Sequence, residues 1–120
     1  MSRLWIAAGA LIGLLAVAAS ALAAHGAADP ARLRLAEFAI TQTGWHALAL
    51  LATGILAERW GGRLLDAAGA CFLLGVVLFS GAVGFLAATG TSPGPFAPVG
   101  GVLLMLGWAL LLAAAVARRT

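Results

Sequence analysis

Charged side chains are scarce in this sequence. Only 9% of its 120 residues are charged, and lysine, asparagine and tyrosine are absent altogether. Soluble domains, by comparison, carry about a quarter charged residues. Hydrophobic residues make up 63% of the chain. This composition excludes an ordinary soluble domain and indicates a protein of the membrane.

Cysteines and clustered basic residues are also lacking. The single cysteine, Cys71, excludes an intrachain disulfide and a cysteine-rich metal site. The net charge is +3, but all the basic residues are arginines, and they are spread between apolar segments instead of lying close together. Binding of nucleic acid relies on a concentrated basic surface. We therefore predict no nucleic-acid partner.

Four long apolar runs dominate what is present, at residues 4–24, 38–57, 67–89 and 99–117. Each run is close to the roughly 20 residues that a transmembrane helix needs, and none contains a charged residue. A backbone in lipid must satisfy its own hydrogen bonds, which favours helices. The prediction is an all-α integral membrane protein whose residues 1–120 form a single four-helix transmembrane bundle.

Boundary residues refine these helices. Asp29 and Pro30 are typical of an N-cap and a first helical position, so the second helix should begin ahead of its apolar run. Gly90 is a candidate C-cap of the third helix, and Pro98 is predicted to open the fourth. Only residues 58–66 separate the second and third runs, which predicts antiparallel neighbours.

The distribution of arginines predicts the orientation. With four spans, Arg32 and Arg34 lie on one side of the membrane. The other five arginines share the opposite side: Arg3, Arg59, Arg63, Arg118 and Arg119. Arginine-rich flanks stay inside, so both termini are predicted to be cytoplasmic.

The first run also has an alternative interpretation. Its basic start, apolar centre and Ala-Leu-Ala triplet ahead of Ala24 resemble a secretory signal peptide. Cleavage would leave three spans and place the new N-terminus outside. The apolar run is longer than a usual signal core, which favours a retained span.

Small residues recur at helical spacing in the spans. Close backbone approach drives association between helices in lipid, so these residues predict packing faces. The predicted helix-packing residues are Gly9, Gly13, Ser20, Gly81, Gly84, Gly101 and Gly107. Such faces would close a bundle, and they would also support self-association.

Polar side chains within the apolar runs form the candidate site. His46 lies inside the second run, and Gln42 is one helical turn earlier on the same face. A neutral imidazole donates at one nitrogen and accepts at the other, so Gln42, Thr43, Ser80 or a backbone carbonyl could satisfy it. Intramembrane polar groups suggest function, whereas a hydrogen bond between helices is the structural alternative.

His25, at the end of the first run, is the second histidine and completes the candidate cluster. The predicted intramembrane polar cluster is His25, Gln42, Thr43, His46 and Ser80. Two histidines can serve as metal ligands or a proton relay. Their spacing matches no metal-site signature, so no metal is predicted. His25 is expected to cap the helix end through terminal carbonyls.

Groups needed for chemistry are missing. No acidic or basic residue lies in the four runs, although ion-coupled transporters usually contain one. The chain also lacks a Walker loop, a dinucleotide fingerprint, a nucleophile elbow and a HExxH motif. We therefore predict a protein that is not an enzyme and has no cofactor.

Several segments together resemble one family. They are AAHGA around His25, TQTGWHALALLATG, AGACFLLGVVLFSGAVGFLAATG, PVGG and LGW. In these segments the chain resembles DUF-type family 423, whose eukaryotic relatives are called transmembrane protein 256. The family tends to have an aromatic residue on each side of the glutamine before the histidine. This chain departs from that pattern between Gln42 and His46, so no aromatic hydroxyl is assigned there.

The resemblance implies a small multi-pass protein of bacterial inner membranes, and it supplies no activity. From the residues, the leading hypothesis is a non-enzymatic accessory or scaffold subunit of a larger membrane complex, acting through helix–helix contacts. Its partners would be the lipid bilayer and another membrane protein or a second copy. Two alternatives stay open: an oligomeric small-solute transporter or channel, and a lipid- or quinone-binding protein.

Overall fold

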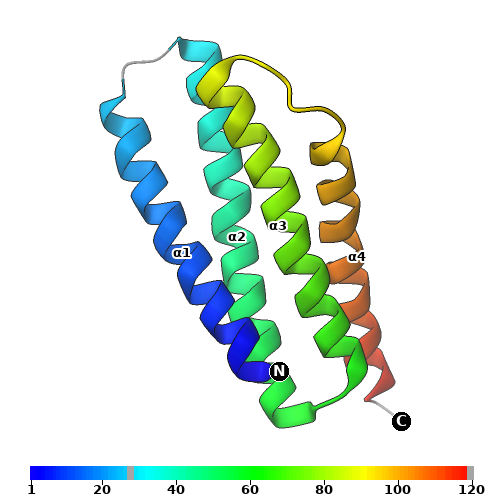
Figure 1. Ribbon diagram of the computed structural model, residues 1–120. Helices are drawn as coiled ribbons and strands as arrows, with labels where there is room; N and C mark the ends of the chain where they lie inside the picture. The colour runs from blue at the N-terminus through cyan, green and yellow to red at the C-terminus, as the bar shows by residue number, and fades with distance from the viewer. Residues whose placement is uncertain (27–28, 119–120) are drawn as a thin grey trace.

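The protein is a row of four antiparallel helices (Figure 1). The computed structural model describes residues 1–26 and 29–118, which contain no strand. The helices are α1 (Ser2–His25), α2 (Pro30–Trp60), α3 (Arg63–Thr89) and α4 (Phe96–Ala117). Each helix packs against the next one along the chain, and α1 barely contacts α3. The all-α prediction with four helices is confirmed.

The helix ends follow the local sequence, with one correction. The Asp29 side chain accepts a hydrogen bond from the Ala31 N–H at 3.3 Å, so Asp29 caps α2 as predicted. Gly90 closes α3 in the left-handed conformation, with φ of 75°. The prediction that Pro98 opens α4 was wrong, because α4 begins at Phe96. Pro98 instead lies in the first turn, where a missing N–H leaves no hydrogen bond unmade.

Three of the described helices, α1, α3 and α4, are long and apolar enough to cross a membrane. The remaining helix, α2, carries Thr41, Gln42, Thr43 and His46 within its apolar run. Its 31 residues correspond to about 46 Å at 1.5 Å per residue. The additional length comes from the segment around Arg32 and Arg34, which continues the helix beyond the apolar run.

Glycines set the distances between neighbouring helices. A Cβ added to Gly9 of α1 would lie 2.8 Å from the Ala47 carbonyl oxygen of α2. On the other side of the molecule, a Cβ on Gly100 of α4 would lie 2.9 Å from the Gly75 carbonyl oxygen of α3. No side chain fits at such distances, so the backbones touch directly at both places. This is the close packing that associates helices in the absence of a hydrophobic driving force.

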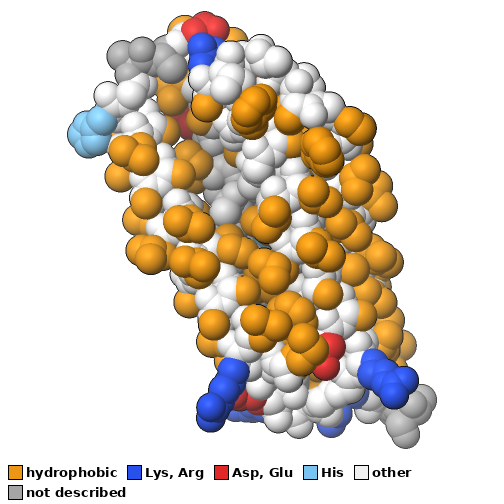
Figure 2. Space-filling view, viewed as in Figure 1, with side chains coloured by type: hydrophobic (Ala, Val, Ile, Leu, Met, Phe, Trp, Pro, Cys, Tyr) orange, Lys and Arg blue, Asp and Glu red, His pale blue; other side chains and the backbone are white. Residues whose placement is uncertain are grey.

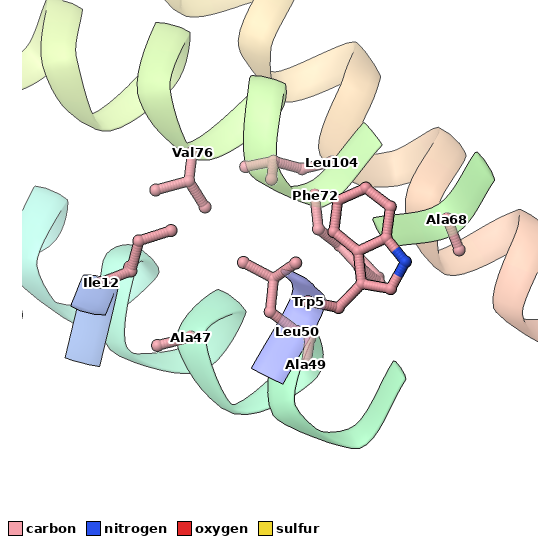
Figure 3. Packing of buried hydrophobic residues seen from close by; sticks show 9 residues of the cluster. All are labelled: Trp5, Ile12, Ala47, Ala49, Leu50, Ala68, Phe72, Val76 and Leu104. Carbon is pink, nitrogen blue, oxygen red and sulfur yellow. The ribbon is translucent and has the colours of Figure 1, made fainter. Parts of the chain in front are cut away.

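All four helices contribute to the buried core, but α1 contributes only with its first half. Figure 3 shows the core cluster, which consists of Trp5, Ile12, Ala47, Ala49, Leu50, Ala68, Phe72, Val76 and Leu104. Within α1, the buried residues are Trp5, Gly9, Ile12 and Ala16, and none follows Ala16. The first half of α1 is therefore packed into the core, and its second half is left without a partner on the α3 side.

Candidate functional site

A groove opens where α1 leaves the core. It has a volume of about 740 Å³ and lies between α1 and α3, with α2 beneath them. Figure 2 shows the hollow in the upper part of the molecule. Along α1 and its C-cap residue, the lining runs from Ile12 to Gly26, which corresponds to about 21 Å at 1.5 Å per residue. The groove therefore follows roughly the second half of α1.

Apolar side chains make up nearly all of the groove wall. From α1 and α2 they are Ile12, Leu15, Ala16, Ala19, Leu22, Ala23, Leu33, Ala36, Ala39 and Ile40, and from α3 they are Val76, Val77, Ala87 and Ala88. Glycines Gly26, Gly81 and Gly84 also line it, and the polar contributors are Arg32, Thr43 and Ser80. Among the described residues of the lining, Arg32 is the one that carries a charge.

The two hydroxyl groups in the groove are bonded to each other. The Thr43 hydroxyl lies 2.7 Å from the Ser80 hydroxyl and 2.6 Å from the Ala39 carbonyl oxygen. A carbonyl can only accept, and each hydroxyl has one proton. Thr43 therefore donates to Ala39, and Ser80 donates to Thr43. Both protons are used within the protein, so the floor of the groove presents no free hydroxyl donor.

Arg32 lies at the end of the groove where α2 begins and α3 ends. Its Nε donates to the Ala87 carbonyl oxygen at 2.7 Å, and its Nη2 donates to the Ala88 carbonyl oxygen. These carbonyls belong to the last turn of α3, whose acceptors have no partners within the helix. A guanidinium group there also complements the negative end of the helix dipole. Arg32 thus joins the start of α2 to the end of α3.

His46 is held by two partners with fixed roles. Its Nδ1 lies 2.7 Å from the backbone carbonyl oxygen of Gln42, which can only accept. The Trp108 indole N–H donates to its Nε2 at 3.1 Å, and an indole can only donate. The imidazole is therefore the neutral tautomer with its proton on Nδ1. This arrangement uses both nitrogens and leaves neither one for a ligand.

Aromatic rings surround His46 and extend the contact to three helices. The Phe72 ring centroid of α3 lies 5.8 Å from that of His46 and 5.2 Å from that of Trp108. His46 is only 4% exposed and is absent from the groove lining. The geometry favours the structural alternative for this histidine, because its hydrogen bond with Trp108 joins α2 to α4.

The predicted polar cluster falls into separate parts. Thr43 and Ser80 meet in the groove, whereas His46 lies outside it and bonds the backbone of Gln42. His25 is exposed at the end of α1. The described residues show no hydrogen bond between His25 and the other four members of the predicted cluster. In the same described residues, no three His, Cys, Asp or Glu side chains form a group able to hold a metal ion.

The predicted packing residues also fall into two groups. Gly9 and Gly107 lie tightly against neighbouring helices, and Gly13 and Gly101 make ordinary contacts of 3.8 and 3.9 Å. In contrast, Ser20 is exposed. A Cβ added to Gly81 or Gly84 would meet nothing within 4 Å, so both face the open groove.

Sequence reasoning missed other residues at which neighbouring helices approach closely. Gly54, Gly69 and Gly75 make backbone or ring contacts as close as those of Gly9. Gly54 could have been found, because it is a small residue that follows Ala47 and Leu50 at intervals of three and four on one face of α2. Arg32 was treated only as an orientation marker, and nothing in the sequence indicated its bonds to the end of α3.

Comparisons with known proteins agree with the segments that carried the resemblance. A family described as Protein of unknown function (DUF423) matches residues 19–101. The chain belongs to the DUF423 family. A UPF0382 membrane protein of Staphylococcus epidermidis is 34% identical across 93% of this chain and 94% of its own length. The UPF0382 membrane protein YwdK of Bacillus subtilis is 34% identical across 95% and 97%.

The family extends to eukaryotes. A UPF0382 membrane protein of Schizosaccharomyces pombe is 33% identical across 86% of this DUF423 chain and 93% of its own length. No solved structure matches the chain. The resemblance noted in the sequence is therefore confirmed, and the names of these relatives state no activity.

The tie between His46 and Trp108 gives a testable prediction for this DUF423 protein. Trp108→Phe removes the indole donor and leaves the buried Nε2 of His46 unpaired, which should lower the free energy of unfolding by about 1 kcal/mol. In a double-mutant cycle with His46→Ala, the coupling should be on the order of 1 kcal/mol. Reversible unfolding in mild detergent, followed by circular dichroism, measures both values.

Trp45→Phe is the matched control, because Trp45 is 62% exposed. Its effect should stay within about 0.5 kcal/mol, as for other exposed substitutions. Equal losses for Trp108→Phe and Trp45→Phe, or a coupling indistinguishable from zero, would show that the bond does not hold α2 and α4 together.

Proposed function

We propose that this DUF423 chain is a multi-pass protein of the bacterial inner membrane in which all four helices cross the bilayer. The apolar lengths of α1, α3 and α4 support this, as do the names of the relatives. The position of α2 supports it too, because α2 packs between α1 and α3. Its buried polar side chains are bonded internally: His46 as described above, and the Thr53 hydroxyl, which donates to the Ala49 carbonyl oxygen at 2.7 Å. A helix whose buried polar groups are satisfied in this way can enter lipid.

The proposed orientation places both termini in the cytoplasm. The start of α1 and the end of α4 lie at the same end of the molecule (Figure 1). Four of the five arginines assigned to this side are at this end of their helices: Arg3, Arg59, Arg63 and Arg118. The fifth, Arg119, lies outside the described residues. Retention of α1 is supported by its buried Trp5 and its backbone contact at Gly9.

Two positions on α2 test this topology. Arg34→Cys and Glu58→Cys, each in a Cys71→Ala background, place one exposed thiol near either end of the helix. We expect a membrane-impermeant maleimide to label Arg34→Cys in intact spheroplasts and Glu58→Cys only after lysis. Labelling of both from one side would show that α2 does not cross, and the reverse pattern would invert the orientation.

Our proposal for function rests on the groove. We propose that this is a non-enzymatic binding protein that holds a chain-like apolar ligand of the bilayer between α1 and α3. The volume of about 740 Å³, over about 21 Å of α1, corresponds to a cross-section of about 35 Å². A helix with side chains is about 10–12 Å wide, or on the order of 80–110 Å². The groove is therefore narrower than a whole helix, which favours a single hydrocarbon chain as the ligand that lies inside it.

The polar groups of the groove favour the same class of ligand. The protons of Thr43 and Ser80 are already donated within the protein, as described above. A polar solute that moves along the groove would need polar partners on its floor, whereas a hydrocarbon chain needs none. The small-solute transporter hypothesis therefore gains less support than lipid binding.

The accessory-subunit hypothesis is retained as a second candidate. It is favoured by Ser20, Gly81 and Gly84, three predicted packing residues that contact no other helix closely in this chain. A partner helix could rest on the rim of the groove and use these small residues for close approach. In that case a protein, instead of a lipid chain, would cover the groove.

A groove-filling substitution distinguishes the two candidates. Gly84→Leu places a side chain in the groove without a clash, because nothing lies within 4 Å of the added Cβ. Gly44→Leu is the matched control: it has equal space but is not part of the lining. After mild extraction and purification, we expect mass spectrometry to find tightly bound lipid with wild type and with Gly44→Leu. Gly84→Leu should retain several-fold less.

Equal lipid in all three preparations would contradict the groove as a binding site. Loss of a co-purified protein with Gly84→Leu, at unchanged lipid content, would instead support the accessory-subunit hypothesis. Neither substitution is expected to disturb the fold, because leucine has a higher helix propensity than glycine, and circular dichroism checks this.

A further inference from the structure

The apolar wall of the groove cannot select its occupant. Lipid tails are as apolar as leucine, so a hydrocarbon chain gains little by leaving the bilayer for the groove. Occupancy instead avoids a void, whose lining atoms would lose dispersion contacts. Chains of any lipid satisfy that requirement equally. Selectivity must therefore come from a polar group of the lining, and Arg32 is the one that is charged.

Arg32 is fixed in place before any ligand arrives. Its Nε and Nη2 are anchored to the carbonyls of Ala87 and Ala88, and both of these residues line the same end of the groove. An arginine has five N–H donors in a planar fork. Two hydrogen bonds therefore leave three donors for another acceptor. Because the side chain is already ordered, little rotamer entropy is lost when a ligand binds.

We propose that the groove holds a phospholipid, with one acyl chain between α1 and α3 and its phosphodiester on the guanidinium group of Arg32. This inference rests on the chain-binding function proposed above and names the ligand class. Phosphate oxygens accept charge-assisted hydrogen bonds from arginine in a geometry that matches the planar fork. A neutral lipid such as diacylglycerol offers no such acceptor.

The length of the groove matches a phospholipid whose acyl chain lies in one leaflet and whose phosphate lies at the membrane surface. One leaflet, headgroups included, is about 20–22 Å thick, of which about 15 Å is hydrocarbon. The groove follows α1 for about 21 Å, from Gly26 at the helix end to Ile12 near the middle of the helix. A chain bound along it would span one leaflet. Its phosphate would then lie at the membrane surface, at the level of Arg32.

The carboxylates at this end define which phospholipids fit. Asp29 and Glu37 are exposed and do not line the groove, and Asp29 is already bonded to the Ala31 N–H. Arg34 is likewise exposed and absent from the lining. The charges of these two carboxylates and two arginines therefore nearly balance, and of the four residues only Arg32 lines the groove. The feature recognised is the phosphodiester and not a net negative charge.

The test compares lipids with matched chains and different headgroups. Full-length delipidated protein is offered phosphatidylglycerol, phosphatidylethanolamine or diacylglycerol, and binding is measured by native mass spectrometry. Hydrogen bonds to a charged group are worth about 1.5–3 kcal/mol, so both phospholipids should bind at least roughly tenfold more tightly than diacylglycerol. Arg32→Gln should reduce this preference to near unity. Arg34→Gln is the matched control and should preserve it.

The outcomes separate this inference from the function on which it rests. Equal binding of phospholipid and diacylglycerol by wild type overturns phosphate recognition and leaves the chain-binding groove intact. An equal loss of preference in Arg32→Gln and Arg34→Gln also overturns it. Binding of no lipid at all by wild type overturns both proposals. If Arg32→Gln fails to fold, because the end of α3 has lost its cap, the headgroup comparison on wild type still decides the matter.

Discussion

The direct contact between the backbones of α1 and α2 determines the shape of this molecule. At Gly9 the approach is so close that no side chain fits, and at Gly54 a Cβ would lie 2.9 Å from the Ser2 carbonyl oxygen. Both contacts are in the first half of α1. They fix that half against α2, and no residue of its second half, beyond Ala16, is buried. The groove is a consequence of where this contact ends.

The polar residues of α2 serve the same arrangement in two ways. His46 bonds the Gln42 carbonyl of its own helix and accepts from the Trp108 indole, and this second bond ties α2 to α4. One turn earlier, Thr43 bonds Ser80 across the floor of the groove and joins α2 to α3. Each of these hydrogen bonds is completed inside the protein. A helix with an unusual number of polar groups can therefore occupy the central position, and the groove above it stays apolar.

Local sequence signals predicted the fold well and the groove poorly. Helix periodicity, the cap at Asp29 and the αL glycine at Gly90 are local, so the four helices could be predicted from the residues. Partners that come from distant helices could not. Trp108 is the 62nd residue after His46, and no pattern in the sequence connects them. The sequence predicted close helix packing at every small residue of this set. At Gly81 and Gly84, however, an added Cβ would meet no atom within 4 Å.

The central claim is that lipid hydrocarbon fills the groove, and nuclear Overhauser contacts in a nanodisc measure this most directly. The full-length, isotope-labelled protein would be placed in bilayers of protonated phospholipid, and the backbone amides of Ser80 and Gly84 observed. The account predicts cross-peaks from acyl-chain methylene protons to both amides, and none from water. Cross-peaks from water would show a hydrated path, and cross-peaks only from protein side chains would show a helix or a collapsed groove. Either of these results would contradict the account.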